Sequence, residues 1–294
     1  MQTYILPKFE NTDIANIKFS HLKEVLDPLF NPYNPHKTRL ETIDRIINHL
    51  NALFEIAIND RYIDYNPCKA LKKQYPSSRK FALKNGIDTR YPAITNKELL
   101  KEFLSDLRDD NKMDLQTKRV VMLQILCVNR PLNTASAMWE HIDLENGIWN
   151  IPAAQMKMRS IHKIALSKEA IAIFKEQRLF SPINIKFVFP ALTMAGHINK
   201  DSIGKAIRNL GGKNKYLYKA SAHGFRATFK TICTLNLATL TKLGISEKTI
   251  ENALAHKELN SIKYAYERKT ATMEQNRTLM QWYVDYLNSI VKFI

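Results

Sequence analysis

The sequence contains few of the residues that build secreted, zinc-bound or membrane-spanning proteins. It has only three cysteines, far apart and odd in number, so they form neither a disulfide framework nor a zinc-ligand pattern. They fit buried thiols in a reducing compartment. No apolar run reaches the roughly 18 residues of a membrane span, and the N-terminus has no signal-peptide core. We therefore expect a cytoplasmic protein without membrane contact or a zinc site.

Glycine and proline are also scarce, at 8 and 11 of 294 residues, while hydrophobic residues make up 45%. This composition predicts an ordered globular chain, and the length allows two domains with separate cores. Acidic residues are in deficit, with 28 Asp and Glu against 44 Lys and Arg, a net charge of +16. A surplus of this size favours a polyanionic partner, and nucleic acid is the first candidate.

Helical periodicity dominates the first 60 residues. Ser20 could cap a short helix through Leu29, and 40–57 carries an apolar stripe at three- and four-residue steps. The stripe consists of Leu40, Ile43, Ile47, Leu50, Phe54 and Ala57. Off the stripe, facing either a phosphate backbone or solvent, lie Arg39, Arg45 and His49. Prolines and basic residues then alternate from 66 to 92, which indicates a basic linker able to follow a DNA backbone.

A second domain begins near residue 93. Thr95 and Glu98 form a capping box that predicts a new helix. Two-residue alternation over 142–166, with a tight turn at Asn146-Gly147, predicts three short antiparallel strands. Further helices are expected at 114–129, at 168–178 after a Ser167 cap, and at 200–210, 223–240, 246–256 and 278–292. The predicted fold class is mainly α with a small antiparallel β-sheet (α+β).

Five short elements carry residues suited to phosphate chemistry. Each is common alone, so the evidence lies in their order, spacing and setting. They are Arg130-Pro131 after an apolar helix, Lys157 in M-K-M-R, His223 and Arg226 in S-A-H-G-F-R-A-T-F, His256 in L-A-H-K, and Tyr266 in A-Y-E-R. As a set they resemble the tyrosine recombinase (phage integrase) family, above all prophage and genomic-island integrases. The resemblance extends from about Ser20 to the end of the chain.

The resemblance implies a DNA strand cleaved and rejoined without metal, nucleotide or cofactor. Tyr266 would attack the scissile phosphate and conserve the bond energy as a 3′-phosphotyrosine. Arg130 and Arg226 would clamp the non-bridging oxygens, which their planar forks suit better than lysine does. The remaining roles are the general acid for the leaving 5′-oxygen at Lys157, the acid–base histidine at His223, and a phosphate hydrogen bond from His256.

Several neighbours compete for these roles. Tyr264 lies about 200° around a helix from Tyr266, so only one can face the site, and the family register selects Tyr266. Lys157 has two rivals, but its seven-residue step to Ile164 matches the family pattern better. The two rivals to Lys157 are Arg159 and Lys163. Two histidines, His162 and His197, are expected to be structural or exposed.

The sequence departs from the family pattern at two points. Asn133 stands where an acidic residue normally follows the first arginine and helps to hold the site. The resemblance also implies that the sequence begins beyond the N-terminal segment with which such integrases bind arm sites and beyond the first helix of the usual core-binding domain. Both departures favour a truncated, reduced or catalytically decayed protein.

The resemblance predicts a C-shaped clamp with a helical core-binding domain and basic linker at 1–90 and a catalytic domain at 93–294. Its partners would be the double-stranded DNA of an attachment or crossover site, other copies in a synaptic tetramer, and accessory DNA-bending proteins. The free protein would be a monomer in the bacterial cytoplasm and would join the nucleoid when bound.

The expected activity is site-specific recombination that integrates or excises a mobile element. The alternatives are Xer-like resolution of chromosome dimers, a catalytically decayed DNA-binding regulator, and a nicking-closing type IB topoisomerase. For the helix at 278–292, an apolar stripe fits either its own domain or docking in trans on a neighbouring subunit, and the family resemblance favours docking in trans.

Overall fold

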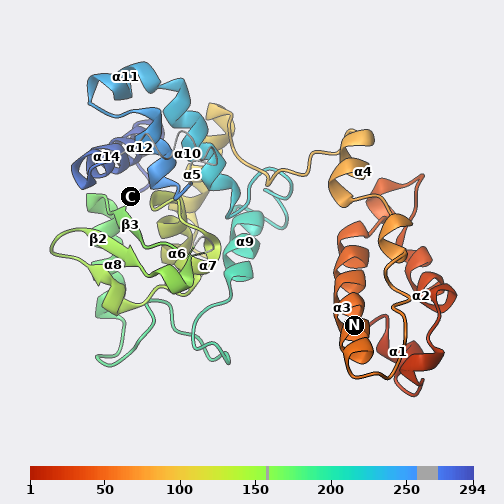
Figure 1. The fold of residues 1–294 in the computed structure, drawn as a ribbon. Coiled ribbons are helices and arrows are strands. Elements are labelled where there is room, and N and C mark those ends of the chain that lie inside the picture. The colour runs from red at the N-terminus through yellow and green to blue at the C-terminus, as the bar shows by residue number, and fades with distance from the viewer. Residues whose placement is uncertain (157–158, 257–270) are drawn as a thin grey trace. The chain divides into compact units, whose positions relative to one another are not determined.

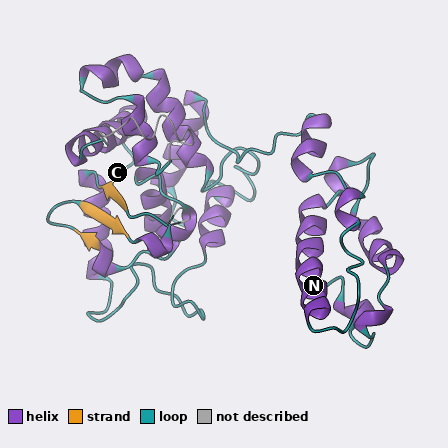
Figure 2. Cartoon of the chain, viewed as in Figure 1, coloured by secondary structure: helices purple, strands orange, loops and turns teal. Residues whose placement is uncertain are grey.

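The computed structural model of the chain describes residues 1–156, 159–256 and 271–294 (Figure 1). Lys157, Met158 and 257–270 lie outside the described residues. The chain divides into two compact units, Met1–Arg90 and Tyr91–Ile294. Helices make up most of both, and a three-stranded antiparallel sheet lies in the second (Figure 2). The predicted fold class is confirmed.

Unit 1 is formed by helices packed around one apolar core. Its α-helices are α1 (Leu6–Phe9), α2 (Phe19–Leu26), α3 (Leu40–Asn59) and α4 (Ser78–Lys84). Short 3₁₀ turns lie at Ile14–Asn16, Asp27–Leu29, Pro35–Lys37 and Leu71–Lys73. Every residue of the stripe predicted for α3 is buried, so the helical spacing identified the face that packs inward.

Two details of unit 1 differ from the sequence prediction. Helix α2 begins at Phe19, with Lys18 rather than Ser20 as its N-cap, and ends before the turn that contains Pro28. The basic stretch from residue 66 is also more than a linker. Its apolar side chains enter the unit 1 core, where the buried ones are Cys68, Leu71, Tyr75 and Phe81.

Unit 2 contains nine described α-helices and the sheet. The helices are α5 (Lys97–Asp109), α6 (Leu115–Leu126), α7 (Pro131–Ala135), α8 (Lys168–Leu179), α9 (Lys200–Asn209), α10 (Gly224–Leu235), α11 (Leu237–Lys242), α12 (Glu247–Ala253) and α14 (Met273–Ile290). Short 3₁₀ turns lie at Trp139–His141 and Ala153–Gln155. The cap of α5 is Asn96, whose Oδ1 accepts from the Leu99 N–H at 2.9 Å, and not the predicted Thr95.

The sheet has the order β1-β2-β3, with β1 (Ile142–Asp143), β2 (Ile148–Ile151) and β3 (His162–Ala165). Gly147, at φ +62°, takes the left-handed conformation in the predicted turn between β1 and β2. Trp149 pairs with Ile164 and Ile151 pairs with His162, so all four share one face. That face is buried, and strand register therefore carries His162 into the interior.

Helix α6 lies at the centre of unit 2 and contacts α7, α8, α9, α10 and α14 (Figure 1). A helix was predicted at 114–129, and α6 confirms it. Consecutive residues from Leu123 to Leu126 are all buried, because neighbouring helices cover every side of its second half. A central helix of this kind can fix the segments that follow it in a rigid frame.

Helix α14 packs within unit 2, against α12, β3 and α6. Leu279, Tyr283, Val284 and Leu287 are fully buried in the core of the unit. The apolar stripe that suggested docking on a neighbouring subunit is therefore largely occupied by the chain's own residues. The structure supports the other interpretation, in which the helix covers its own domain.

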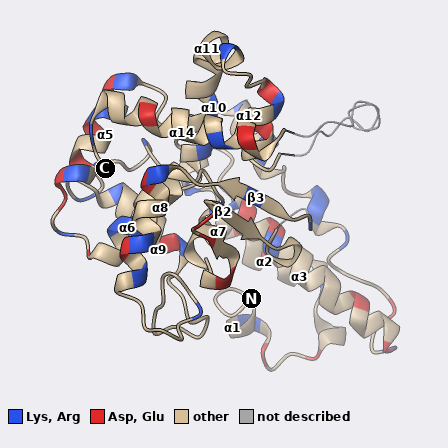
Figure 3. Ribbon diagram, turned by 90° about the vertical axis from the view of Figure 1, so that its left-hand side faces the viewer, with Lys and Arg blue, Asp and Glu red and all other residues tan. Residues whose placement is uncertain are grey.

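Charged residues of both signs are mixed on several helices of unit 2. Lys and Arg alternate with Asp and Glu along α5 and α8, whereas β2 carries no charged residue (Figure 3). The surplus of positive charge is therefore not concentrated on either of these helices.

Candidate functional site

Arg130 lies on the short loop that joins α6 to α7. The loop turns at Val128, whose φ of +45° is costly for a β-branched residue and requires support from its surroundings. The side chain of Asn129 gives part of that support, since its Oδ1 accepts from the Arg130 N–H at 2.8 Å. Pro131 then begins α7, where its missing N–H costs no hydrogen bond. The loop thus presents the half-buried Arg130 side chain beside the site.

Arg226 connects this loop to the end of α12. It lies in the first turn of α10 and is only 6% exposed. Its Nη1 donates to the Val128 carbonyl at 2.8 Å, and its Nη2 donates to the Leu254 carbonyl. Burial and the charge of Arg130 lower the Arg226 pKa to about 10, so the guanidinium is charged at neutral pH. One arginine therefore both fixes the loop and adds charge next to Arg130.

His223 occupies the N-cap position of α10. Its ring lies 4.3 Å from the ring of Tyr91, which the sequence did not single out. Burial lowers the His223 pKa, and the positive charges of Arg226 and Arg130 lower it further. The imidazole is therefore held largely neutral at physiological pH, in a form that can accept a proton.

The glycine of the H-G-F-R element has a steric role. A Cβ at Gly224 would lie 1.8 Å from the Pro92 carbonyl oxygen, so no side chain fits there. Ser221 completes the contact, because its Oγ accepts from the Gly224 N–H and donates to Pro92 O, both at 2.9 Å. The start of α10, which carries His223, is thereby fixed against the beginning of unit 2.

His256 directly faces Arg226. Its Nε2 lies 3.2 Å from Arg226 Nη2, and its Nδ1 lies 2.6 Å from Glu251 Oε2. The other Glu251 oxygen pairs with Lys230 Nζ at 2.6 Å. Burial raises the Glu251 pKa, but hydrogen bonds from Lys230 and His256 outweigh it and hold that pKa below its usual value. Glu251 is therefore a carboxylate at neutral pH.

His162, which was expected to be structural or exposed, lies buried beside the two arginines. It is 9% exposed and hydrogen-bonds the backbone of Ala253 at the end of α12. Burial, followed by the charges of Arg226 and Arg130, lowers its pKa to about 4. A neutral imidazole thus lies beside the two arginines, and period-two alternation on β3 was the signal that could have placed it there.

Gln124 ties two site segments together from inside α6. The residue is fully buried. Its Nε2 donates to the Asn129 carbonyl at 2.7 Å and to the Ala222 carbonyl at 3.0 Å, while its Oε1 accepts from Thr134 Oγ1 at 2.8 Å. The residues before Arg130 and before His223 are therefore bound to the same side chain. A glutamine in the buried second half of α6 gave no sequence signal of this function.

Asn133 is 4% exposed and donates from Nδ2 to Met156 Sδ at 3.2 Å. Arg130 Nη1 lies 4.0 Å from the same sulfur. An amide thus occupies the position at which the resemblance predicted an acidic residue. Its contact and that of Arg130 converge on the thioether of Met156, which immediately precedes Lys157 in the sequence.

The structure brings together four of the six predicted catalytic residues: Arg130, His223, Arg226 and His256. The other two, Lys157 and Tyr266, lie outside the described residues, as does the rival Tyr264. The two rivals to Lys157, Arg159 and Lys163, are exposed. His197, which was expected to be structural or exposed, hydrogen-bonds the Ile198 carbonyl.

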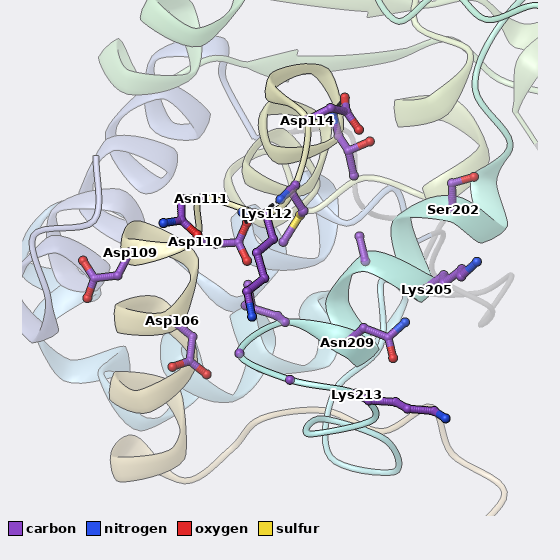
Figure 4. Close-up of a pocket in the computed structure, with 16 residues that line it drawn as sticks. Asp106, Asp109, Asp110, Asn111, Lys112, Asp114, Ser202, Lys205, Asn209 and Lys213 are labelled. Carbon is purple, nitrogen blue, oxygen red and sulfur yellow. Dashed lines mark hydrogen bonds between the residues drawn. The ribbon is translucent and has the colours of Figure 1, made fainter.

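A pocket of about 780 Å³ lies elsewhere in unit 2, between the end of α5, the start of α6 and α9 (Figure 4). Its walls carry Asp106, Asp109, Asp110 and Asp114 together with Lys112, Lys205 and Lys213. None of the predicted catalytic residues lines it. Across the described ranges, no group of three or more His, Cys, Asp or Glu side chains is arranged to hold a metal ion. Over the same ranges, no helix is long and apolar enough to cross a membrane.

Comparison with known proteins gives a consistent result. Residues 94–273 match the model of the phage integrase family. Prophage integrase IntA of Escherichia coli K12 is 28% identical over 286 residues, which cover 97% of this chain and 62% of IntA. The integrase of Enterobacteria phage P4 is 26% identical over 302 residues, covering 98% of this chain and 63% of that protein. The chain therefore spans less than two thirds of the length of these two relatives.

Solved structures share the fold at lower identity. A λ integrase fragment (75–356), determined as a dimer bound to a COC′ core site, superimposes with a TM-score of 0.55 and 13% identity, covering 92% of this chain and 87% of the fragment. The Tn1549 transposon integrase, determined with transposon right-end DNA, gives a TM-score of 0.51 and 17% identity, covering 92% and 86%.

Proposed function

The chain belongs to the phage integrase family, and we propose that it is a site-specific tyrosine recombinase that cleaves and rejoins duplex DNA through a 3′-phosphotyrosine. The observation that carries the proposal is the convergence of Arg130, Arg226 and two histidines in unit 2. Two adjacent guanidinium groups repel each other unless an anion lies between them. A phosphodiester is such an anion, and its charge increases as the nucleophile attacks.

The proposed roles follow from what each side chain can donate. Arg130 and Arg226 would bind the non-bridging oxygens, and a preorganised donor of this kind contributes about 10²–10³ to the rate. His223, held largely neutral, can accept the proton of the attacking phenol. Tyr266 would be that nucleophile, and Lys157 would protonate the leaving 5′-oxygen. Bond energy kept in the phosphotyrosine would allow rejoining without a nucleotide.

We further propose that unit 1 is a core-binding domain and that unit 2 is the catalytic domain. The DNA partner would be an attachment or crossover site, recognised by a monomer that assembles into a tetramer in synapsis, with DNA-bending accessory proteins. The net charge of +16 supports a polyanionic partner. Integration or excision of a mobile element is the biological outcome that the two relatives support, with dimer resolution as the alternative.

The direct test is covalent trapping. The chain is incubated with a library of end-labelled duplexes, and DNA in SDS-resistant adducts is sequenced. Tyr266→Phe should abolish the adduct and leave duplex affinity within a few-fold, because affinity comes from many phosphate contacts. Tyr264→Phe is the matched control and should retain the adduct. If the adduct instead survives Tyr266→Phe and disappears in Tyr264→Phe, the assignment of the nucleophile is wrong.

A second experiment tests the general acid. A 5′-phosphorothiolate duplex has a sulfur leaving group that needs no protonation. Lys157→Ala should therefore cleave this duplex at nearly the wild-type rate while remaining slow on the oxygen substrate. Failure of sulfur to restore cleavage would assign Lys157 another role.

Asn133 is the observation that favours a second candidate, a DNA-binding regulator without catalysis. Its amide contacts Met156 and supplies no carboxylate to Arg130. Wild-type protein that binds duplexes tightly but forms no adduct with any library member would support that candidate.

A further inference from the structure

A chain of three polar contacts ends on Arg226. Lys230 Nζ lies 2.6 Å from Glu251 Oε1, Glu251 Oε2 lies 2.6 Å from His256 Nδ1, and His256 Nε2 lies 3.2 Å from Arg226 Nη2. Lys230 and Arg226 lie on α10, Glu251 lies on α12, and His256 follows the end of α12. The sequence motifs single out His256 and Arg226 but neither of the other two.

These contacts determine which imidazole nitrogen carries the proton. A carboxylate can only accept a hydrogen bond, so the nitrogen that faces Glu251 must be Nδ1–H. A guanidinium can only donate, so the nitrogen that faces Arg226 must be an unprotonated Nε2 in the neutral ring. Both edges of the His256 ring are therefore fixed, and its neutral form is the Nδ1–H tautomer.

The same contacts limit what Arg226 can offer to a phosphate. Arg226 Nη2 has two hydrogens, and the observed acceptors for them are the Leu254 carbonyl and His256 Nε2. A phosphate oxygen that approaches this nitrogen must compete with neutral His256. Once Nε2 is protonated, the imidazolium no longer accepts from Arg226 and becomes a donor itself. Protonation of His256 therefore changes it from a competitor of the phosphate into a ligand of the phosphate.

Charged groups face His256 from each of these elements. Arg226 and Lys230 come from α10, Glu251 comes from α12, and His223 at the start of α10 is within electrostatic range. Of these groups only Glu251 is anionic, so it stabilises an imidazolium, whereas Lys230 draws on the same carboxylate and opposes it. The His256 side chain is 45% exposed, so bulk solvent can supply the proton.

We propose that Glu251 is a positioning residue for strand cleavage, an inference that rests on the proposed function. It holds His256 by Nδ1 and stabilises the form that donates Nε2–H to the scissile phosphate, which frees Arg226 Nη2 for the same phosphate. His256 takes one proton from solvent, and no bond other than that N–H forms in this step. Lys230, which pairs with the same carboxylate, weakens the stabilisation of the His256 imidazolium by Glu251.

The first experiment examines the free protein and needs no DNA. Nitrogen-15 histidine labelling of the full chain reports the tautomer of each imidazole, and the His256 signals are assigned by their loss in His256→Asn. Wild type should have His256 as the Nδ1–H tautomer. Glu251→Gln should keep it, because the amide oxygen still accepts, and Glu251→Leu should release it toward the Nε2–H form. An unchanged tautomer in Glu251→Leu would overturn the positioning role.

The second experiment measures single-turnover cleavage against pH, on a duplex that the wild-type protein traps covalently. Glu251→Gln should move the high-pH limb of the rate profile to lower pH, and Lys230→Met should move it to higher pH. Above neutral pH, the cleavage rate of Glu251→Gln should be about tenfold or more below that of wild type, by analogy with residues that hydrogen-bond metal-binding histidines in other proteins. Damage to the fold would not move the profile in two opposite directions.

Glu247→Gln is the matched control, because it removes the same charge from the first turn of the same helix. It should leave the pH profile in place. Shifts of the same sign in Glu251→Gln and Lys230→Met, or a Glu251→Gln profile equal to that of Glu247→Gln, would refute the inference. If wild type forms no adduct with any duplex, the proposed function fails instead, and the tautomer measurement still decides whether Glu251 positions His256.

Discussion

Replacing Gln124 with leucine should separate site geometry from overall stability. The side chain is fully buried and makes three hydrogen bonds, two donated to the carbonyls of Asn129 and Ala222 and one accepted from Thr134. Leucine fills a similar volume but removes the donor from both carbonyls and leaves Thr134 Oγ1 with only its 3.5 Å contact to the Arg130 carbonyl. At about 1–3 kcal/mol for each buried polar group, partly offset by apolar packing, the free energy of unfolding should fall by about 3–5 kcal/mol. For a domain of this size the midpoint of thermal unfolding should fall by roughly 6–20 °C.

Gln177 provides a matched control within the same unit. It is a buried glutamine on α8, 3% exposed, and it donates to the Val188 carbonyl at 3.0 Å and accepts from Arg119 at 3.2 Å. Gln177→Leu should therefore cause a comparable loss of stability without touching the site. Both variants are assayed for thermal unfolding, duplex affinity and single-turnover cleavage, at a temperature well below both unfolding midpoints.

The two variants should differ only in cleavage. Gln124 fixes the residues before Arg130 and His223, and a displacement of about 1 Å can cost about 10² in rate. Gln124→Leu should therefore lose about two orders of magnitude in cleavage while duplex affinity stays within a few-fold, and Gln177→Leu should cleave at nearly the wild-type rate. Equal cleavage rates in the two variants would refute the reasoning, because the loss of stability alone would then explain every effect.

Arg226→Lys keeps the charge but cannot make the contacts to Val128, Leu254 and a phosphate together, so single-turnover cleavage should fall by about 10²–10³; a near-normal rate would contradict the clamp. His162 has a folded pKa of about 4, below the 6.5 of the free side chain, so the unfolded state binds its proton first as pH falls. The His162 contribution to the free energy of unfolding should thus decline by about 3 kcal/mol between pH 6.5 and 4 and be fully present above that window, and urea titrations should show a smaller decline in His162→Gln. Duplex affinity should fall by about 10³–10⁵ between 50 and 200 mM salt if six to ten phosphates are contacted, and a flat dependence would exclude extensive backbone contact.

The sequence predicted best those elements whose pattern is set by burial on one face. The stripe of α3 has the helical period because one side of that helix meets the unit 1 core and the other meets water. The sheet was predicted for a related reason, since alternation and the turn at Gly147 determine strand pairing locally. Helix α6 was also predicted, but the complete burial of its second half was not, because burial on every side leaves no periodic contrast to detect.

Helix starts were less well predicted because several polar residues near a boundary compete for the cap. Thr95 and Asn96 can both accept from the first turn of α5, and asparagine is the stronger N-cap. Ser20 is not the N-cap of α2 because the helix begins one residue before it, at Phe19, which places Ser20 inside the first turn. Such shifts of one or two residues change neither the core nor the position of the site.

At the site, the sequence could identify residues that carry recognisable motifs but not those that hold them. Arg130, Arg226 and His256 could be selected by their spacing. Gln124 and Glu251 could not, because their contacts are to backbone carbonyls or to a residue of another motif, and these become visible only when the helices have packed. A polar residue within an apolar helix gives no information about which distant segment it will meet.

The replacement of the usual acidic residue by Asn133 has a consequence for the charge of the site. In this chain the Arg130 loop is fixed through its backbone, by hydrogen bonds from Gln124 to Asn129 and from Arg226 to Val128. Those contacts hold the loop without cancelling charge, and the mutual repulsion of the arginines helps to lower the Arg226 pKa to about 10. Glu251 is the one carboxylate among the described residues that raises this pKa. The paired arginines therefore gain more from a bound anion than they would if position 133 also carried a carboxylate, which supports the proposal that a phosphate binds between them.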